Sequence, residues 1–190
     1  MAISDTVRIE KKVAVIGHSF VRYLPLPTMP HKPDSRLSQT VYFRKFHRSG
    51  ATALNLLDRI EEDISLFQPD LSFVIIGGND LDRSGPINFR EVVDNIKTVL
   101  DRVRLHTRGE VYCCTIEKRP SPRYVNPIRF NIYKNRVNQI MKKDRSIRLF
   151  FSQARDNTTL DGVHLNDVGN EDLVREISNK TADWGLQHGW

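Results

Sequence analysis

Cysteine is scarce in this chain, whose 190 residues include only Cys113 and Cys114. Neighbouring side chains of an extended strand point to opposite faces, so this adjacent pair is poorly placed to form a disulfide. The sequence also has no set of cysteines and histidines with the spacing that is typical of a metal site. We therefore expect two reduced thiols, no metal, no cofactor, and a core that needs no covalent cross-link.

Long apolar runs are absent as well. No segment approaches the length needed to cross a bilayer, and residues 1–12 lack the apolar stretch of a signal peptide. Together with the reduced cysteines, these absences predict an intracellular, cytoplasmic protein. We find no internal repeat and no low-complexity linker, and the length fits one domain over residues 1–190.

Runs of like charge are also absent, although the chain is basic. The formal net charge is +6, and the lysines and arginines are dispersed along the sequence. One interpretation is an ordinary solvated surface. The other is a weak attraction to nucleic acid or to an anionic membrane. The sequence alone leaves both open.

Short apolar runs bounded by turn residues are present and predict buried strands. The predicted strands are Lys12–Gly17, Thr40–Phe46, Leu71–Gly77, Glu110–Ile116 and Ile147–Ser152. Between them, apolar residues recur at helical spacing, which predicts amphipathic helices packed on the core. The stripes are Leu54, Leu57, Ile60 and Ile64; Val92, Ile96, Val99 and Val103; Phe130, Tyr133, Val137 and Ile140; and Leu173 with Ile177.

This alternation predicts a three-layer α/β/α fold in which helices cover both faces of a five-stranded parallel sheet. We expect a doubly wound, flavodoxin-like strand order. Folds of this class place their sites at the carboxyl ends of the strands. Functional residues should therefore follow the strands directly, and two proline-rich segments, Leu24–Arg36 and Arg119–Pro127, should be irregular loops.

Three polar or glycine features follow the first three predicted strands. Ser19 comes after the first strand, Gly50 after the second and Asn79 after the third. Each also has a purely structural interpretation. A serine here is a common helix N-cap, a glycine permits a turn, and an asparagine can bond its own backbone.

An aspartate and a histidine, Asp161 and His164, follow the fifth strand, three residues apart. A carboxylate can hold the imidazole through Nδ1–H and leave Nε2 free to take a proton from a hydroxyl. A structural hydrogen bond, or half of a metal site, is the alternative for this pair. The four features combined supply a nucleophile, a base, an orienting acid and hydrogen-bond donors, as acyl transfer requires.

The four segments resemble the sequence blocks of the SGNH hydrolase superfamily, also called GDSL esterases or lipases. The resemblance runs from the first strand to Asn166, in the family's order. Its specific parts are Gly77-Gly78-Asn79-Asp80 and Asp161-Gly162-Val163-His164-Leu165-Asn166. The resemblance implies that Ser19 is the nucleophile and that Asp161 and His164 complete a catalytic triad. It further implies an oxyanion hole formed by the Ser19 N–H, the Gly50 N–H and the Asn79 side chain.

One position departs from the family pattern, because His18 stands where the family usually has aspartate. We expect its side chain to face solvent, the alternative being a second titrating group at the site. The chain also resembles the compact esterase domains that some retrotransposons encode, in which Gly-His-Ser-Phe variants occur.

The predicted function is hydrolysis of short-chain acyl or acetyl esters, with a small ester or lipid as substrate. Candidate substrate contacts are His18, Asp80, Arg119 and Arg123, and the two arginines would meet an anionic group. The alternative is a catalytically degenerate module of the same fold that binds nucleic acid or an anionic membrane. The retained Ser19, Asn79, Asp161 and His164 favour the enzyme.

Overall fold

The structure is a computed structural model, and it describes residues 10–27, 40–150 and 161–189. Five strands form one parallel sheet in the order β2-β1-β3-β4-β5. The strands are β1 (Glu10–Gly17), β2 (Thr40–His47), β3 (Leu71–Ile75), β4 (Val111–Cys114) and β5 (Arg148–Phe150). This confirms the predicted flavodoxin-like fold.

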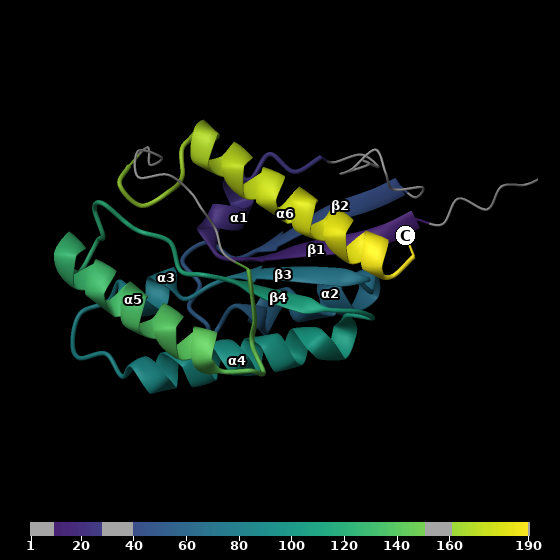
Figure 1. The fold of residues 1–190 in the computed structure, drawn as a ribbon. Coiled ribbons are helices and arrows are strands. Elements are labelled where there is room, and N and C mark those ends of the chain that lie inside the picture. The colour runs from purple at the N-terminus through teal and green to yellow at the C-terminus, as the bar shows by residue number, and fades with distance from the viewer. Residues whose placement is uncertain (1–9, 28–39, 151–160, 190) are drawn as a thin grey trace, which may run out of the picture.

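Helices cover both faces of the sheet (Figure 1). One face carries α1 (Ser19–Tyr23) and α6 (Asp167–Gln187). The other face carries α2 (Glu61–Phe67), α4 (Phe89–His106) and α5 (Pro127–Lys143). The remaining helical elements are the 3₁₀ turn η1 (Leu57–Arg59) and α3 (Gly78–Leu81). None of the described helices is long and apolar enough to cross a membrane.

Each face of the sheet has its own apolar core, because the strand side chains alternate between the two faces. Ile16, Val74 and Cys113 point to the side of α2, α4 and α5. Val15 and Phe73 belong to the second cluster, with α1 and α6. Both cysteines are buried and neither is in a disulfide, and burial raises the pKa of Cys113 to about 12.

The predicted strands are found, with different ends. β1 begins two residues earlier and β2 ends one residue later than predicted, whereas the others are shorter. β3 stops at Ile75, so Ile76 and Gly77 belong to the following turn, and β4 covers only the centre of its predicted range. In the fifth strand, residues 151–152 lie outside the described residues. The apolar stripes of α4, α5 and α6 are confirmed, with Tyr133 and Ile140 partly buried.

The predicted helix from Leu54 was wrong at its start. Leu54 is 66% exposed, and the α-helix begins only at Glu61. Asn55 is the reason, because its side chain accepts the Thr52 N–H at 3.0 Å and its own N–H bonds back to the Thr52 carbonyl. Such local side-chain bonds compete with helix formation. This turn extends the irregular segment that follows β2.

Candidate active site

Ser19 lies in the tight turn between β1 and α1. It is the first residue of the helix and is partly exposed. The N-cap is His18, whose ring accepts the Phe20 N–H at 3.3 Å. The capping role that the sequence left open for Ser19 is therefore taken by its neighbour, and the Ser19 hydroxyl has another partner.

That partner is His164, which is 145 residues away in the chain. The Ser19 Oγ lies 2.8 Å from Nε2 of His164, and Nδ1 of the same ring lies 2.7 Å from Oδ2 of Asp161. An ionised carboxylate only accepts, so Nδ1 carries the proton and Nε2 is left as an acceptor. The Ser19 hydroxyl therefore donates to the imidazole, and the three side chains form one continuous relay.

Asp161 is held in place by the loop that carries it. Its Oδ1 accepts the backbone N–H of His164 at 2.7 Å and that of Val163 at 2.9 Å. Partial burial raises the pKa of the Asp161 carboxyl, but these bonds and the His164 ring outweigh it and lower the pKa to about 2. The carboxylate thus stays ionised at every pH at which an imidazole can be neutral.

Aromatic side chains of α1 pack against the His164 ring. Tyr23 meets it edge-on with ring centroids 5.2 Å apart, and Phe20 lies at 5.9 Å. Tyr23 is 51% exposed, whereas Phe20 is buried. The ring is therefore packed from the protein side while one flank of the site faces solvent.

Gly50 and Asn79 lie in two segments that are joined by a hydrogen bond. The Asn79 Nδ2 donates to the carbonyl of Ala51, the residue after Gly50, at 2.8 Å. Gly50 has a φ of 74°, which favours glycine. Its N–H has no hydrogen-bond acceptor among the described residues. The loop is tied to the end of β1 by the Arg48 N–H, which donates to the Gly17 carbonyl at 3.0 Å.

Asp80 does not face the site. Its carboxylate is buried and accepts the Ala53 N–H at 3.1 and 3.2 Å. Burial raises the pKa of this carboxyl. Asp80 therefore fixes the loop that contains Gly50, and the structure places it away from the position of a substrate contact.

His18 is buried, so the expectation that it faces solvent was wrong. It is 3% exposed and packs edge-on against Phe20, with ring centroids 4.7 Å apart. Burial, with smaller contributions from Arg119 and His164, lowers the pKa of His18 to about 3. The ring is neutral near pH 7 and acts as a hydrogen-bond acceptor, which is the role that an aspartate can fill at an N-cap.

The two candidate arginines differ. Arg119 is 2% exposed and lies behind the site, 3.2 Å from Asp82, so it does not reach out to a substrate. Arg123 is exposed, and its guanidinium lies 5.2 Å from the centroid of the Tyr124 ring. Of the pair, only Arg123 is positioned to contact a molecule arriving from solvent.

Asp82 is a buried residue that the sequence reasoning missed. Its two oxygens accept the Tyr124 N–H at 2.8 Å and the Arg123 N–H at 2.9 Å, in addition to the Arg119 bond. Nothing in the sequence around it distinguishes this aspartate from a surface residue. Its partners lie 37 to 42 positions away, so only the fold reveals it.

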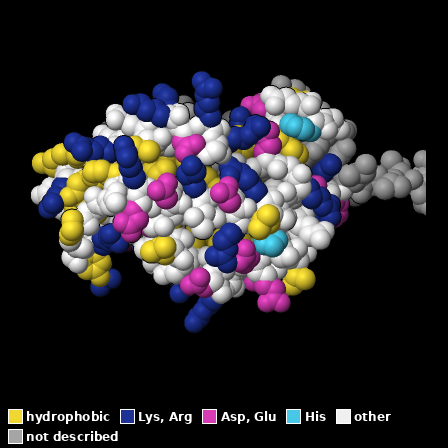
Figure 2. Space-filling model, turned by 90° about the horizontal axis from the view of Figure 1, so that it is seen from below, with side chains coloured by type: hydrophobic (Ala, Val, Ile, Leu, Met, Phe, Trp, Pro, Cys, Tyr) yellow, Lys and Arg dark blue, Asp and Glu magenta, His cyan; other side chains and the backbone are white. Residues whose placement is uncertain are grey.

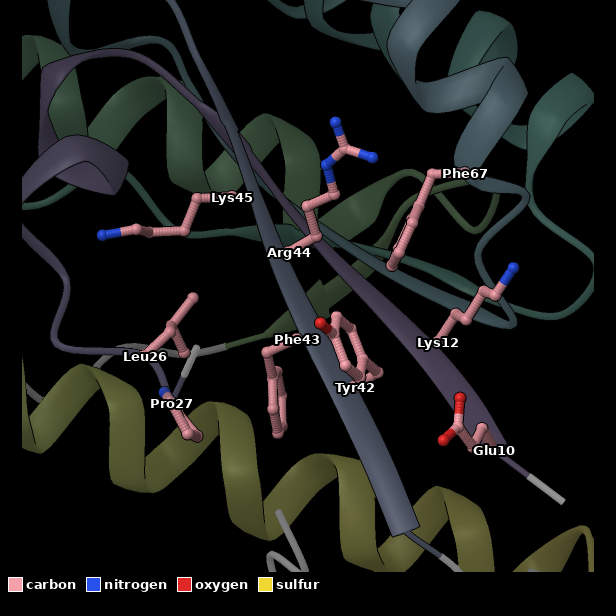
Figure 3. A pocket seen from close by; sticks show the side chains of 9 residues that line it. All are labelled: Glu10, Lys12, Leu26, Pro27, Tyr42, Phe43, Arg44, Lys45 and Phe67. Atoms are coloured by element: carbon pink, nitrogen blue, oxygen red, sulfur yellow. The ribbon is translucent and has the colours of Figure 1, made fainter. Parts of the chain in front are cut away.

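A separate hollow of about 710 Å³ lies along the edge strand β2 (Figure 3). In Figure 3, Phe67 and Arg44 lie beside each other, and the Arg44 guanidinium is 5.6 Å from the centre of the Phe67 ring. None of the candidate site residues lines this hollow. Within the described ranges, no group of three or more histidines, cysteines and acidic residues is placed to hold a metal ion.

No protein-family model matches the chain, and no curated protein matches it. Several solved structures are similar in fold. A lipase/acylhydrolase from Enterococcus faecalis is 16% identical with a TM-score of 0.63, over 90% of this chain and 94% of that one. A GDSL-like lipase from Bacteroides thetaiotaomicron is 20% identical with a TM-score of 0.65, over 91% and 88%.

A carbohydrate acetylesterase from Sinorhizobium meliloti is 14% identical with a TM-score of 0.65, covering 92% of this chain and 99% of that one. All three similarities extend over about nine-tenths of this chain or more. The chain therefore has the three-layer fold that these lipases and esterases share.

Proposed function

We propose that this chain is a serine ester hydrolase of the SGNH superfamily, with Ser19, His164 and Asp161 as its catalytic triad. The observation that carries the proposal is the relay from the Ser19 Oγ through the His164 ring to Asp161, with contacts of 2.8 and 2.7 Å. The fold shared with lipases and esterases, and the four sequence blocks, support it.

In the proposed reaction, the Ser19 Oγ attacks the carbonyl carbon of the ester and gives its proton to Nε2 of His164. The carbonyl oxygen becomes an oxyanion, and the tetrahedral intermediate then releases the alkoxide, which takes the proton from His164. Water, deprotonated by the same ring, attacks the acyl group on Ser19 and releases the acid. The steps need no group beyond the protein and water.

The proposed oxyanion hole consists of the Ser19 N–H, the Gly50 N–H and the Asn79 Nδ2. The bond from Asn79 to the Ala51 carbonyl supports this grouping, because it brings the amide beside Gly50. One of the two Nδ2 protons is used in that bond, which leaves the second for a ligand. Each donor of this kind stabilises the transition state by about 3 kcal/mol.

We propose short acyl groups, acetyl above all, as the substrates. Tyr23, which packs against the His164 ring, is 51% exposed, so this flank of the site opens to solvent and offers no enclosed channel for a long chain. The S. meliloti relative is a carbohydrate acetylesterase, which agrees with this substrate class. The similarity of residues 17–20 to retrotransposon-encoded esterase domains stays a prediction.

Replacing the nucleophile tests the proposal. Ser19→Ala should fold normally and lose turnover of p-nitrophenyl acetate, because no other hydroxyl of the described residues is hydrogen-bonded to the His164 ring. Ser65→Ala, on α2, is the matched control and should keep full activity. Turnover by purified Ser19→Ala at the wild-type rate would refute the assignment.

A further inference from the structure

A buried arginine lies directly behind the proposed oxyanion hole. Arg119 follows β4 in an irregular segment and is 2% exposed. Its guanidinium lies 5.6 Å from the ring centroids of both Phe20 and Phe130. Arginine is rarely buried without a specific partner, so the contacts that hold it here need a physical reason.

Two polar contacts satisfy the guanidinium. Nη1 donates to Oδ2 of Asp82 at 3.2 Å, and Nη2 donates to Oδ1 of Asn79 at 2.9 Å. Burial lowers the pKa of Arg119, while Asp82 opposes that change; an arginine nonetheless stays protonated in proteins. The charge is therefore balanced by Asp82, while the second arm of the guanidinium is directed at the Asn79 amide.

The backbone of α3 is shaped to admit this arm. A Cβ at Gly78 would lie 2.5 Å from Nη2 of Arg119, closer than real Cβ atoms approach. A side chain at Gly78 would therefore displace the guanidinium from this position. The contact places a full positive charge one hydrogen bond away from Asn79.

The partners of Asn79 determine which way its amide faces. A guanidinium can only donate, so the atom facing Arg119 must be the oxygen Oδ1. The Ala51 carbonyl can only accept, so the atom facing it must be Nδ2. Both partners impose the same orientation. Without Arg119, the Ala51 contact alone would have to keep the amide from rotating.

We infer that Arg119 is a positioning residue that locks the Asn79 amide with one Nδ2 proton toward the Ala51 carbonyl and the other toward the substrate oxygen. The inference rests on the proposed function. The positive charge of Arg119 also polarises the Asn79 amide, since charged donors strengthen the hydrogen bonds in a connected network. Arg119 acts through Asn79 and does not itself touch the substrate.

A double-mutant cycle in turnover of p-nitrophenyl acetate tests this role. Arg119→Met should lower kcat about 10- to 100-fold with KM nearly unchanged, below the roughly 10²- to 10³-fold loss expected when an oxyanion donor is removed. In the Asn79→Ala background, the same substitution should change kcat by less than about threefold, since interacting residues are not additive. Equal losses in both backgrounds, or no loss in the wild type, would overturn the inference.

Removing Arg119 leaves Asp82 as an unpaired buried charge, which can destabilise the fold. Combining Arg119→Met with Asp82→Asn removes that charge. The double-mutant cycle with Asn79→Ala is then measured again with this combined variant. Arg119→Lys keeps a donor and should restore part of kcat, with the same dependence on Asn79. Arg108→Met is the matched control for loss of charge, because Arg108 is exposed near the amino ends of β3 and β4, away from the site, and should leave kcat unchanged.

Together with Ser19→Ala, the cycle distinguishes a failure of the proposed hydrolase function from a failure of the positioning role of Arg119. Activity in Ser19→Ala, or none in the wild type, would refute the proposed hydrolase itself. An active wild type, an inactive Ser19→Ala and additive losses at Arg119 and Asn79 would refute only the role of Arg119.

Discussion

At the scale of single residues, His18 and Asp161 show how the same fold holds two titrating groups in opposite ways. Asp161 keeps its charge because three donors surround it. His18 loses its charge because burial places it in an environment without a compensating acid, near Arg119. The ionised carboxylate orients His164, and the neutral ring caps α1 beside Ser19.

The buried His18 predicts a pH dependence of stability. Its pKa is lowered to about 3, so the unfolded chain binds a proton near pH 6.5 that the folded chain does not. The free energy of unfolding should therefore fall as the pH is lowered through this range, with a slope from this group of up to about 1.4 kcal/mol per pH unit. Urea unfolding between pH 7 and pH 4 measures it.

His18→Asn is the informative variant for that measurement. Asparagine is a good N-cap that can accept the Phe20 N–H but does not titrate. The variant should lose stability less steeply on acidification than the wild type. Equal slopes for the two proteins would show that His18 titrates in the folded state much as it does in the unfolded chain.

At the scale of elements, the start of α6 fixes the loop that carries the base. His164 lies two residues before the N-cap Asn166, whose side chain accepts the Gly169 N–H at 3.0 Å. The Asn170 Nδ2 donates to the Leu165 carbonyl at 3.2 Å, which ties the loop to the first turn of the helix. Helix capping and placement of the imidazole are thus coupled.

This coupling predicts that Asn166→Ala affects both stability and turnover. Loss of an N-cap costs about 1 kcal/mol, and the same loss should loosen the His164 loop and lower kcat. Asn88→Ala, at the N-cap of α4, is the matched control. It should cost similar stability and leave kcat unchanged. Thermal unfolding and turnover of the two variants test the idea, which fails if both have the same kcat.

The periodicity of the sequence predicts the strands and long helices, because each buries one regular apolar face. It fails at Leu54, where the Asn55 side chain favours a turn over a helix. The residues after strands could be identified from their chemical type, because the parallel fold gathers strand ends. The burial of Arg119 and its bond to Asp82 could not be predicted from the sequence, because they depend on tertiary contacts that no local pattern records.

At the scale of the whole molecule, charges of both signs share the face that carries α4 and α5. Figure 2 shows lysine and arginine side chains mixed with acidic ones over the face that carries α4 and α5. This face therefore shows no patch of a single sign. The concentrated polar chemistry lies instead at the carboxyl end of the sheet, around Ser19.

The shape of that end predicts a preference for short acyl chains. The exposed Tyr23 flanks the imidazole, so the site opens to solvent on this side. We expect kcat/KM to be highest for the acetyl and butyryl p-nitrophenyl esters and to fall for the octanoyl ester. A rise in kcat/KM toward long chains would mean that an acyl groove exists elsewhere in the molecule.

The most direct test of the account is labelling with a fluorophosphonate, because it reports the nucleophile without knowledge of the substrate. We predict one covalent adduct, mapped by mass spectrometry to Ser19, in the wild-type protein. His164→Ala should be labelled far more slowly, because the serine then has no base within hydrogen-bond distance. An unlabelled wild type, an adduct on another residue, or labelling that does not depend on His164 would contradict the account.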